Sequence, residues 1–164
     1  LAKDCKFYGS DINVEMIDWC RANFHNIEFY QNSLTPPLVF DDASIDVAYC
    51  TSVFTHLSEE YQEMWLEEIS RVLKRDGIFI LTVHGDYYAE RKLIPEEFEQ
   101  YKAGELVVRL NTAEGSRTTT TFQNEKYMRE KLLKGFTILE HIPSHDLELA
   151  GSQDIWIIQN KALA

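Results

Sequence analysis

The chain has 164 residues, and its 16 Lys and Arg against 27 Asp and Glu give a formal net charge of −11. A length of this order predicts one domain whose core needs no metal or disulfide, and the hydrophobic fraction of 45% excludes a disordered protein. The acidic balance argues against nucleic acid or an anionic membrane surface as a partner, because both are bound by clustered Lys and Arg.

The three cysteines, Cys5, Cys20 and Cys50, are odd in number and widely spaced. Without a C-x-x-C pair they predict reduced cysteines in a cytoplasmic protein, and neither a disulfide framework nor a zinc site. No apolar run approaches the roughly 18 residues of a membrane span. The first residues lack the apolar core of a signal peptide, and the chain does not open with Met, so we expect its start to be a cut.

Short apolar runs alternate with helical patterns along the first half of the chain. The runs predict strands at 6–12, 27–31, 45–50 and 78–83, and the patterns predict helices at 14–24 and 59–74. Asn13 and Ser58 suit the N-caps of the two helices, and Gly77 suits the stop of the second. Strands that alternate with helices form parallel βαβ units, so we expect four parallel strands of one sheet with helices on both faces.

The pattern changes after Gly85. Residues 86–123 resemble an insertion, with a short helix around 95–102 and a hairpin made of 106–110 and 118–122. An amphipathic helix at 124–135 follows, and then two strands at 136–142 and 154–160, which we expect to pair antiparallel. The predicted fold is a single α/β domain over residues 1–164, a three-layer sandwich with a mostly parallel sheet and an antiparallel last strand.

Five segments, taken in order, resemble a class I S-adenosylmethionine-dependent methyltransferase of the small type 11/12 branch. They are GSDIN, PPLVFDDASIDVAYC, SVFTHLSEE, RVLKRDG and DIWIIQNK. The resemblance covers nearly the whole chain. It implies a Rossmann-like sheet with the strand order 3-2-1-4-5-7-6 and S-adenosyl-L-methionine as the cofactor.

The sequence departs from this family at its beginning. The six predicted strands correspond to the second to seventh of the family, and neither the first strand nor the glycine-rich turn after it is found. We favour a fragment of a longer enzyme over a shortened, inactive relative, because the loss would cost the burial of a central strand. We expect the 164-residue chain by itself to bind S-adenosylmethionine weakly or not at all, since the turn supplies backbone donors. Exposed strand edges would also allow pairing with another chain.

The adenosine end of the cofactor is assigned to the ends of the first two predicted strands. Asp11 stands at the carboxyl end of a strand, where a carboxylate can accept hydrogen bonds from a ribose diol, although a simple helix-start role is the alternative. By resemblance, Ile12 packs beside the adenine and Asn32 accepts a hydrogen bond from the adenine amino group, with Ser33 beside it and Leu34 against the ring. An ordinary turn is the alternative for Asn32.

The remaining candidates follow the third and fourth predicted strands. The resemblance places Thr51 and Ser52 against the methionine part of the cofactor. His56, in SVFTHL, and His84, in TVHGDYY, are the candidate catalytic residues, because a histidine can serve as a general base near neutral pH. A structural histidine held under a loop is the alternative for His56, and a polar loop residue is the alternative for His84.

The function that we expect is methyl transfer from S-adenosylmethionine to a small-molecule acceptor, with residues 86–123 shaping the acceptor side. A methyltransferase-fold remnant that acts as a binding or oligomerising module is the second hypothesis, and the missing glycine-rich turn favours it. A nicotinamide-dependent oxidoreductase fragment is the third, because Asp11 would suit either ribose.

Overall fold

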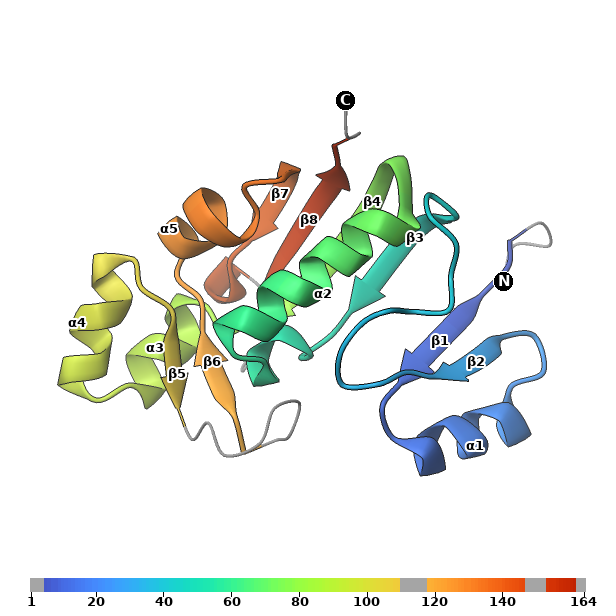
Figure 1. Ribbon diagram of the computed structural model, residues 1–164. Helices are drawn as coiled ribbons and strands as arrows, with labels where there is room; N and C mark the ends of the chain where they lie inside the picture. The colour runs from blue at the N-terminus through green and yellow to red at the C-terminus, as the bar shows by residue number, and fades with distance from the viewer. Residues whose placement is uncertain (1–4, 110–117, 147–152, 162–164) are drawn as a thin grey trace. The chain divides into compact units, whose positions relative to one another are not determined.

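The computed structural model describes residues 5–109, 118–146 and 153–161. The chain divides into two compact units, Leu1–Val39 and Phe40–Ala164. Figure 1 labels the elements of both units along the chain. None of the helices in the described ranges has the length and apolar character that crossing a membrane requires.

The first unit is a small βαβ motif. Strand β1 (Tyr8–Asp11) and strand β2 (Glu28–Gln31) pair in parallel around helix α1 (Val14–Asn23). The helix begins where the sequence predicts, because the Asn13 side chain accepts a hydrogen bond from the Met16 N–H at 3.1 Å. The parallel pairing brings the carboxyl ends of both strands to the same edge of the motif.

The second unit is built on a four-stranded sheet with the order β3-β4-β8-β7. Its strands are β3 (Ile45–Cys50), β4 (Leu73–Val83), β7 (Phe136–Ile142) and β8 (Asp154–Asn160). Strand β3 is parallel to β4, whereas β8 is antiparallel to both of its neighbours. The predicted antiparallel pair of late strands is therefore confirmed.

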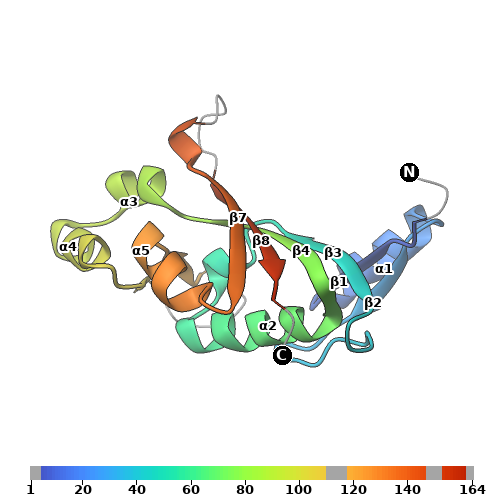
Figure 2. The ribbon, with the colours of Figure 1, turned by 90° about the horizontal axis from the view of Figure 1, so that it is seen from above.

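Helices of the second unit cover one face of this sheet. Helix α2 (Glu59–Val72) and helix α5 (Glu125–Tyr127), which continues as a π-helix over Met128–Leu132, lie on the same side of the strands (Figure 2). The alternating buried side chains of β4 and β8 point toward them. The main core lies between these layers, and its largest fully buried side chains include Trp156, Phe79, Leu81, Met128 and Leu133.

The outer strand of this sheet is only partly covered. Val47 and Tyr49 of β3 are 56% and 78% exposed, while Ala48 and Cys50, on the alternate face, pack against the core. Among the described residues of this unit, no strand pairs with the outer edge of β3. The apolar composition of β3 suits a strand that is buried on both faces. Within this unit, however, only one of its faces packs against the core.

The expectation of one sheet for the first four strands is wrong. Each predicted parallel pair is confirmed, but β1–β2 and β3–β4 belong to separate sheets. The physical reason is that none of the described strands hydrogen-bonds to both β1 and β3. The mixed α/β fold, with parallel pairing among its first four strands and an antiparallel last strand, is confirmed.

The largest boundary difference from the predictions is at the start of β4. Strand β4 begins at Leu73 rather than at residue 78, directly after α2 ends at Val72. Gly77 therefore lies inside the strand and does not stop the helix, and a Cβ there would come within 2.9 Å of the Lys74 carbonyl oxygen. Ser58 stands at the N-cap of α2, but its side chain makes no capping hydrogen bond.

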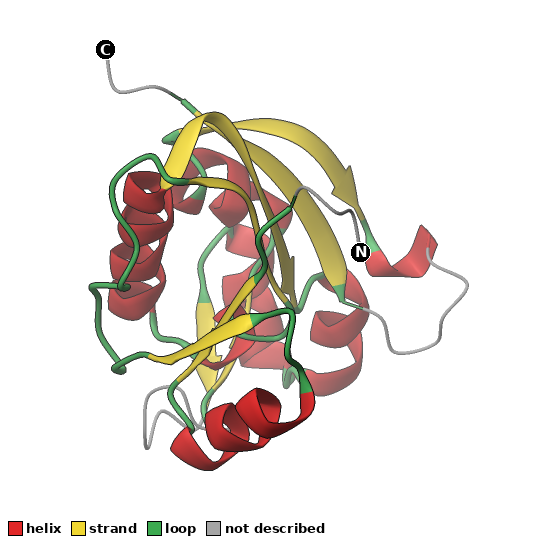
Figure 3. Cartoon of the chain, turned by 90° about the vertical axis from the view of Figure 1, so that its right-hand side faces the viewer, coloured by secondary structure: helices red, strands yellow, loops and turns green. Residues whose placement is uncertain are grey.

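The predicted insertion folds into helices and a hairpin that share a core of their own (Figure 1). Figure 3 distinguishes helices, strands and loops by colour. The insertion contains α3 (Asp86–Lys92), which the sequence does not predict, α4 (Pro95–Ala103), and the antiparallel hairpin of β5 (Val107–Arg109) and β6 (Thr120–Phe122). Part of the predicted hairpin, residues 110–117, lies outside the described residues. The buried side chains of this second core are Ala89, Tyr101, Val107 and Phe122.

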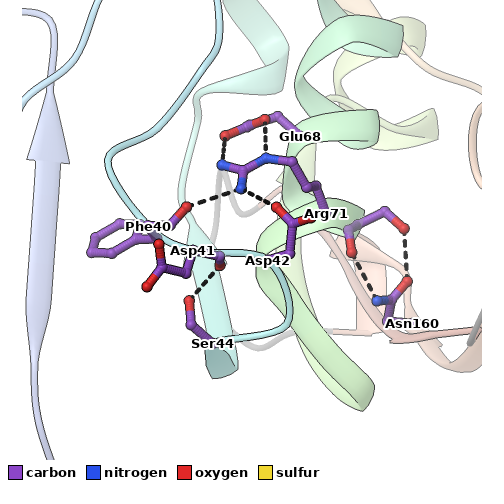
Figure 4. Close-up of polar contacts among 8 residues, drawn as sticks. Phe40, Asp41, Asp42, Ser44, Glu68, Arg71 and Asn160 are labelled. Carbon is purple, nitrogen blue, oxygen red and sulfur yellow. Dashed lines mark hydrogen bonds and ion pairs between the residues drawn. The ribbon is translucent and has the colours of Figure 1, made fainter.

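Arg71 connects α2 to the loop that leads into β3 (Figure 4). Its guanidinium donates to both carboxylate oxygens of Glu68, at 2.9 and 2.6 Å, to the Phe40 carbonyl oxygen at 2.9 Å and to the Asp42 carboxylate at 2.6 Å. The Glu68 side chain is 6% exposed. Hydrogen bonds to Glu68 and Asp42 raise the pKa of Arg71, so the guanidinium stays charged and neutralises a buried carboxylate.

We expect Arg71→Met to lower the free energy of unfolding by about 3 kcal/mol, because it leaves the buried Glu68 carboxylate without its guanidinium. Urea denaturation followed by circular dichroism measures the change. Arg75→Met is the matched control, since Arg75 is 79% exposed and lies 3.8 Å from Asp76; its effect should stay within about 0.5 kcal/mol. Equal stability of the two variants would show that Arg71 does not hold the loop.

Candidate functional site

The predicted adenosine-side residues lie together at the carboxyl ends of β1 and β2. The Asn32 N–H donates to the Asp11 carbonyl oxygen at 3.1 Å, which places the two side chains on neighbouring strand ends. The Asp11 Oδ1 accepts from the Asn13 N–H at 2.7 Å. Its Oδ2 has no hydrogen-bond partner among the described residues. Asp11 therefore contributes to the helix start, as the alternative interpretation held, and still keeps one carboxylate oxygen for a ligand.

Asn32 is oriented by its neighbour. Its Nδ2 donates to the Ser33 carbonyl oxygen at 2.7 Å, which leaves Oδ1 as the outward acceptor. Ile12 and Leu34, on the same two strand ends, are 43% and 36% exposed. A carboxylate oxygen, an amide oxygen and two exposed aliphatic side chains match the ribose hydroxyls, amino group and ring faces of an adenosine, so the donor set of this unit fits that part of the cofactor.

In the second unit, the loop after β3 is tightly held. Ser52 has a φ of +58°, in the left-handed region. Its N–H donates to Thr82 Oγ1 at 2.9 Å, its Oγ accepts from Gln153 Nε2 at 2.5 Å, and its carbonyl oxygen accepts from Thr55 Oγ1 at 2.9 Å. Ser52 is thus committed to internal hydrogen bonds, whereas Thr51 beside it is exposed. Of the two predicted cofactor residues in this loop, Thr51 has the groups available for a ligand.

A buried polar network holds the next turn, Phe54–His56. Three side chains donate to the Phe54 carbonyl oxygen: Gln62 Nε2 at 3.2 Å, Thr121 Oγ1 at 2.9 Å and Gln123 Nε2 at 3.0 Å. All three side chains belong to residues that are at most 1% exposed. The network joins the turn after β3 to α2 and to β6, so the insertion and the turn are parts of one rigid arrangement.

The two predicted histidines are held in the same way by neighbouring carbonyls. Nδ1 of His56 lies 2.7 Å from the Thr119 carbonyl oxygen, and Nδ1 of His84 lies 3.1 Å from the Thr121 carbonyl oxygen. Because a carbonyl oxygen can only accept, each Nδ1 carries a proton and donates it. The opposite nitrogen of each ring, Nε2, is directed away from this backbone.

His84 is neutral at physiological pH. It is 9% exposed, and burial lowers its pKa to about 4; the nearby His56 contributes to the lowering, and the bond to Thr121 opposes it. With the proton on Nδ1, Nε2 carries a lone pair that can accept a hydrogen bond or a proton.

His84 lines a cavity of about 720 Å³ at the carboxyl end of β4. The other lining residues come from all four elements of the insertion and are Tyr88, Lys92, Glu97, Val108, Arg109, Thr120 and Phe122. His56 is not among the lining residues, so the structure brings only one of the two candidate bases to this cavity. Within the described ranges, no cluster of three or more His, Cys, Asp or Glu could hold a metal ion.

Sequence reasoning found the two histidines but missed what orients them. The carbonyls of Thr119 and Thr121, together with Gln123, could not be assigned from spacing, because their partners lie 63, 37 and 69 positions away along the chain. One signal was present: in a strand, successive side chains point to opposite faces. The consecutive threonines therefore place the Thr120 and Thr121 hydroxyls on opposite faces of β6.

Comparison with known proteins shows which proteins this chain resembles in sequence and in fold. Residues 1–81 match the family model described as a methyltransferase domain. A solved S-adenosylmethionine-dependent methyltransferase from Methanosarcina mazei aligns with a TM-score of 0.67 at 21% identity, over 94% of this chain and 81% of that one.

Two further structures show the same fold. A 1,6-didemethyltoxoflavin N1-methyltransferase from Burkholderia thailandensis, solved with 1,6-didemethyltoxoflavin and S-adenosylhomocysteine, aligns with a TM-score of 0.62 at 15% identity, over 96% of this chain and 62% of that one. A complex of a putative methyltransferase with the Trm112 methyltransferase activator, from Haloferax volcanii, aligns with a TM-score of 0.63 at 18% identity, over 94% and 72%. The chain therefore has the fold of S-adenosylmethionine-dependent methyltransferases, and its first 81 residues match the methyltransferase-domain family.

Proposed function

We propose that the protein transfers a methyl group from S-adenosylmethionine to a small-molecule acceptor bound in the cavity beside His84. The observation that carries the proposal is a neutral histidine, with its Nε2 lone pair available, that lines a 720 Å³ cavity at the carboxyl end of β4 in a methyltransferase fold. Ligands of open parallel sheets bind outside the carboxyl ends of the strands. The relative from Burkholderia thailandensis, whose structure holds a small heterocyclic molecule, supports an acceptor of this size class.

Each unit, taken by itself, has residues that suit one part of the cofactor: the strand ends of the first unit suit the adenosine, and the loop after β3 suits the methionine part. Asp11 Oδ2 would accept from the ribose hydroxyls, and Asn32 Oδ1 from the adenine amino group. Ile12 and Leu34 would contact the ring, beside Ser33. Thr51 would face the methionine part, on a loop whose shape Ser52 maintains.

S-adenosylmethionine supplies an activated methyl group on sulfonium, so the protein mainly positions the acceptor and removes a proton from it. His84 Nε2 accepts a hydrogen bond from the acceptor's O–H or N–H and thereby orients the reacting atom. That hydrogen becomes strongly acidic as the new bond to the methyl carbon forms, and Nε2 then takes it. A base whose pKa is lowered to about 4 is sufficient for this role, because the proton is lost late. His56 would act as a positioning residue beside it.

A non-catalytic binding module is the second candidate, and one observation favours it. In the described part of the chain, no strand pairs with the outer edges of β1 and β3. Unpaired strand edges are templates for pairing with another segment or chain. Cofactor binding separates the two candidates, because the binding module would not need an adenosine site.

The transfer itself is tested with S-adenosylmethionine that carries a labelled methyl group. We expect the protein at its full natural length to place label in the small-molecule fraction of a cell extract, because the cavity has the size of a metabolite site. Mass fractionation into small molecules, nucleic acids and proteins measures the outcome. Label confined to nucleic acid or protein, or no transfer at all, would contradict the proposal.

Asp11→Ala should weaken S-adenosylhomocysteine binding by about 1.5–3 kcal/mol, because it removes a charged hydrogen-bond acceptor from the ribose. Isothermal titration of the full-length protein measures the affinity. Asp18→Ala is the control, since Asp18 lies on α1 and pairs with Arg21 at 3.3 Å. If Asp11→Ala binds as tightly as Asp18→Ala, Asp11 serves only the helix start.

The neutral state of His84 predicts a stability that depends on pH. The pKa of His84 is about 4 in the folded protein and about 6.5 in an unfolded chain, so below pH 6.5 the unfolded state takes up the proton first. Stability is therefore full above pH 6.5 and falls as the pH drops toward 4. Between pH 7 and pH 5 the wild type should lose about 2 kcal/mol more than His84→Asn, which cannot be protonated.

Urea denaturation at the two pH values measures this difference. His145→Asn is the control for removing an exposed histidine of the same unit, and it should keep the wild-type loss. A His84→Asn variant that loses as much stability as the wild type would mean that His84 is not buried in its neutral form.

A further inference from the structure

The cavity beside His84 has a lining that is aromatic toward the end of the β5–β6 ladder where Phe122 lies, and charged toward the other end, where Arg109 pairs with Thr120 and contacts Lys92. Its volume of about 720 Å³ lies within the range of roughly 300–1,000 Å³ that is typical of small-molecule sites. All of its lining residues belong to the second unit. The cavity can therefore be analysed within this unit alone.

One end of the cavity is aromatic. The His84 ring centroid lies 4.3 Å from that of Tyr88 and 5.5 Å from that of Phe122, and each pair of planes is tilted by 38°. Val108, which is 37% exposed, adds an aliphatic side chain to the lining. Aromatic rings prefer offset-stacked or edge-to-face contacts with other rings. This end therefore favours a planar, unsaturated molecule over a flexible aliphatic one.

The other end carries a local positive charge. Arg109 is fixed by Glu97, with Nε 3.0 Å from the carboxylate, and by a hydrogen bond of 2.6 Å from Nη1 to the Lys92 carbonyl oxygen. The Lys92 ammonium has no ion-pair partner among the described residues. With His84 neutral, two cations and one carboxylate give the lining a net charge of +1, in a chain whose net charge is −11. The sign of the site is opposite to that of the protein, which favours an anionic ligand.

Building on the proposed function, we propose that the methyl acceptor is a planar aromatic acid that carries a hydroxyl or ring N–H toward His84 and a carboxylate toward Lys92. The hydroxyl or N–H donates to Nε2 of His84, and the ring lies against Tyr88 and Phe122. The carboxylate is neutralised by the Lys92 ammonium. Methylation exchanges the hydrogen of the O–H or N–H for the methyl group, with the proton passing to Nε2.

Two other ligand classes fit the lining less well. A sugar needs many polar partners, and the uncharged polar groups of the lining are limited to the Thr120 hydroxyl, the Tyr88 hydroxyl and the His84 ring. A cationic amine would meet Lys92 and Arg109 at the end where the aromatic acid places its carboxylate. The aromatic acid uses the rings, the lone pair and the ammonium at once.

The test uses 4-hydroxybenzoate as the probe and measures its binding by amide NMR shifts in the absence of cofactor. Three analogues each remove one recognised feature: 4-hydroxybenzamide removes the charge, benzoate removes the hydroxyl, and cyclohexanecarboxylate removes the hydroxyl and the planar ring. We expect 4-hydroxybenzoate to bind most tightly and to shift the amides of β5, β6 and α3. 4-Hydroxybenzamide should bind at least about tenfold more weakly.

Matched variants locate the probe. Lys92→Met should weaken 4-hydroxybenzoate about threefold to tenfold and leave 4-hydroxybenzamide unchanged. Lys102→Met is the control, because Lys102 pairs with Glu99 at 2.6 Å on α4 and does not line the cavity. Val108→Trp should block both probes by filling the cavity, and the amide spectrum of each variant shows whether it remains folded.

Equal affinity for 4-hydroxybenzoate and 4-hydroxybenzamide, or an effect of Lys102→Met as large as that of Lys92→Met, would overturn the proposal. So would the absence of binding by all four probes to the folded protein. The probe-binding experiment tests the class of ligand, whereas the labelling experiment tests methyl transfer. Probe binding without methyl transfer would contradict the proposed function and keep the ligand class, whereas transfer to an uncharged or aliphatic molecule would keep the function and overturn the class.

Discussion

The acceptor side of this domain depends on strand β6, because one face of the strand joins the buried polar network and the other face lines the cavity. Thr121 of the strand and Thr119, which directly precedes it, are fully buried, and the Thr121 hydroxyl donates to the Phe54 carbonyl oxygen. Its even-numbered neighbours, Thr120 and Phe122, line the cavity. The backbone of the same segment holds both histidines by their Nδ1 atoms. A shift of one residue in its register would exchange the two faces and release the histidines together.

Burial and hydrogen bonding act on His84 in a combination that suits a proton acceptor. Burial removes the charge at neutral pH, and the Thr121 carbonyl places the remaining proton on Nδ1. Neither effect alone would be enough: a neutral ring without the carbonyl would exchange between two tautomers, and a charged ring would have no lone pair. The side chain is thus prepared for its role by groups that do not touch the ligand.

The sequence predicted the strands and long helices of this fold well because they depend on local patterns. Strand β3 was predicted at its observed boundaries, and Asn13 at its capping position, since apolar runs and caps are properties of neighbouring residues. The prediction that β1 and β3 share one sheet was wrong, because none of the described strands pairs with both of them, and which strands become neighbours is not a local property of the sequence. Helix α3 was missed because seven residues, DYYAERK, show too short an apolar period.

The site residues divide in the same way, into those that a local pattern indicates and those that only the tertiary fold brings together. His84 and Asp11 were selected as candidates because strand ends in an α/β fold are where ligands bind. Lys92 and Arg109 were not, since they come to the cavity through the folding of the insertion on its own small core, and nothing in their spacing indicates a shared lining. The charge of a site is a property of the assembled surface. The overall charge of −11 would by itself predict a negative site, whereas the lining of this cavity is positive.

The separate core of the insertion has a consequence for how this protein can diversify. Tyr101, Val107 and Phe122 pack with one another and not with Phe79, Leu81 or Trp156 of the main sheet. Substitutions at Val108 or Thr120 can therefore remodel the cavity without disturbing the packing that gives the domain most of its stability. Mutational tolerance should be high at Val108 and Thr120 and low at Phe122, Thr119 and Thr121, which are buried. Descendants of one ancestral domain could then acquire different acceptors by changing a few positions on a single strand pair.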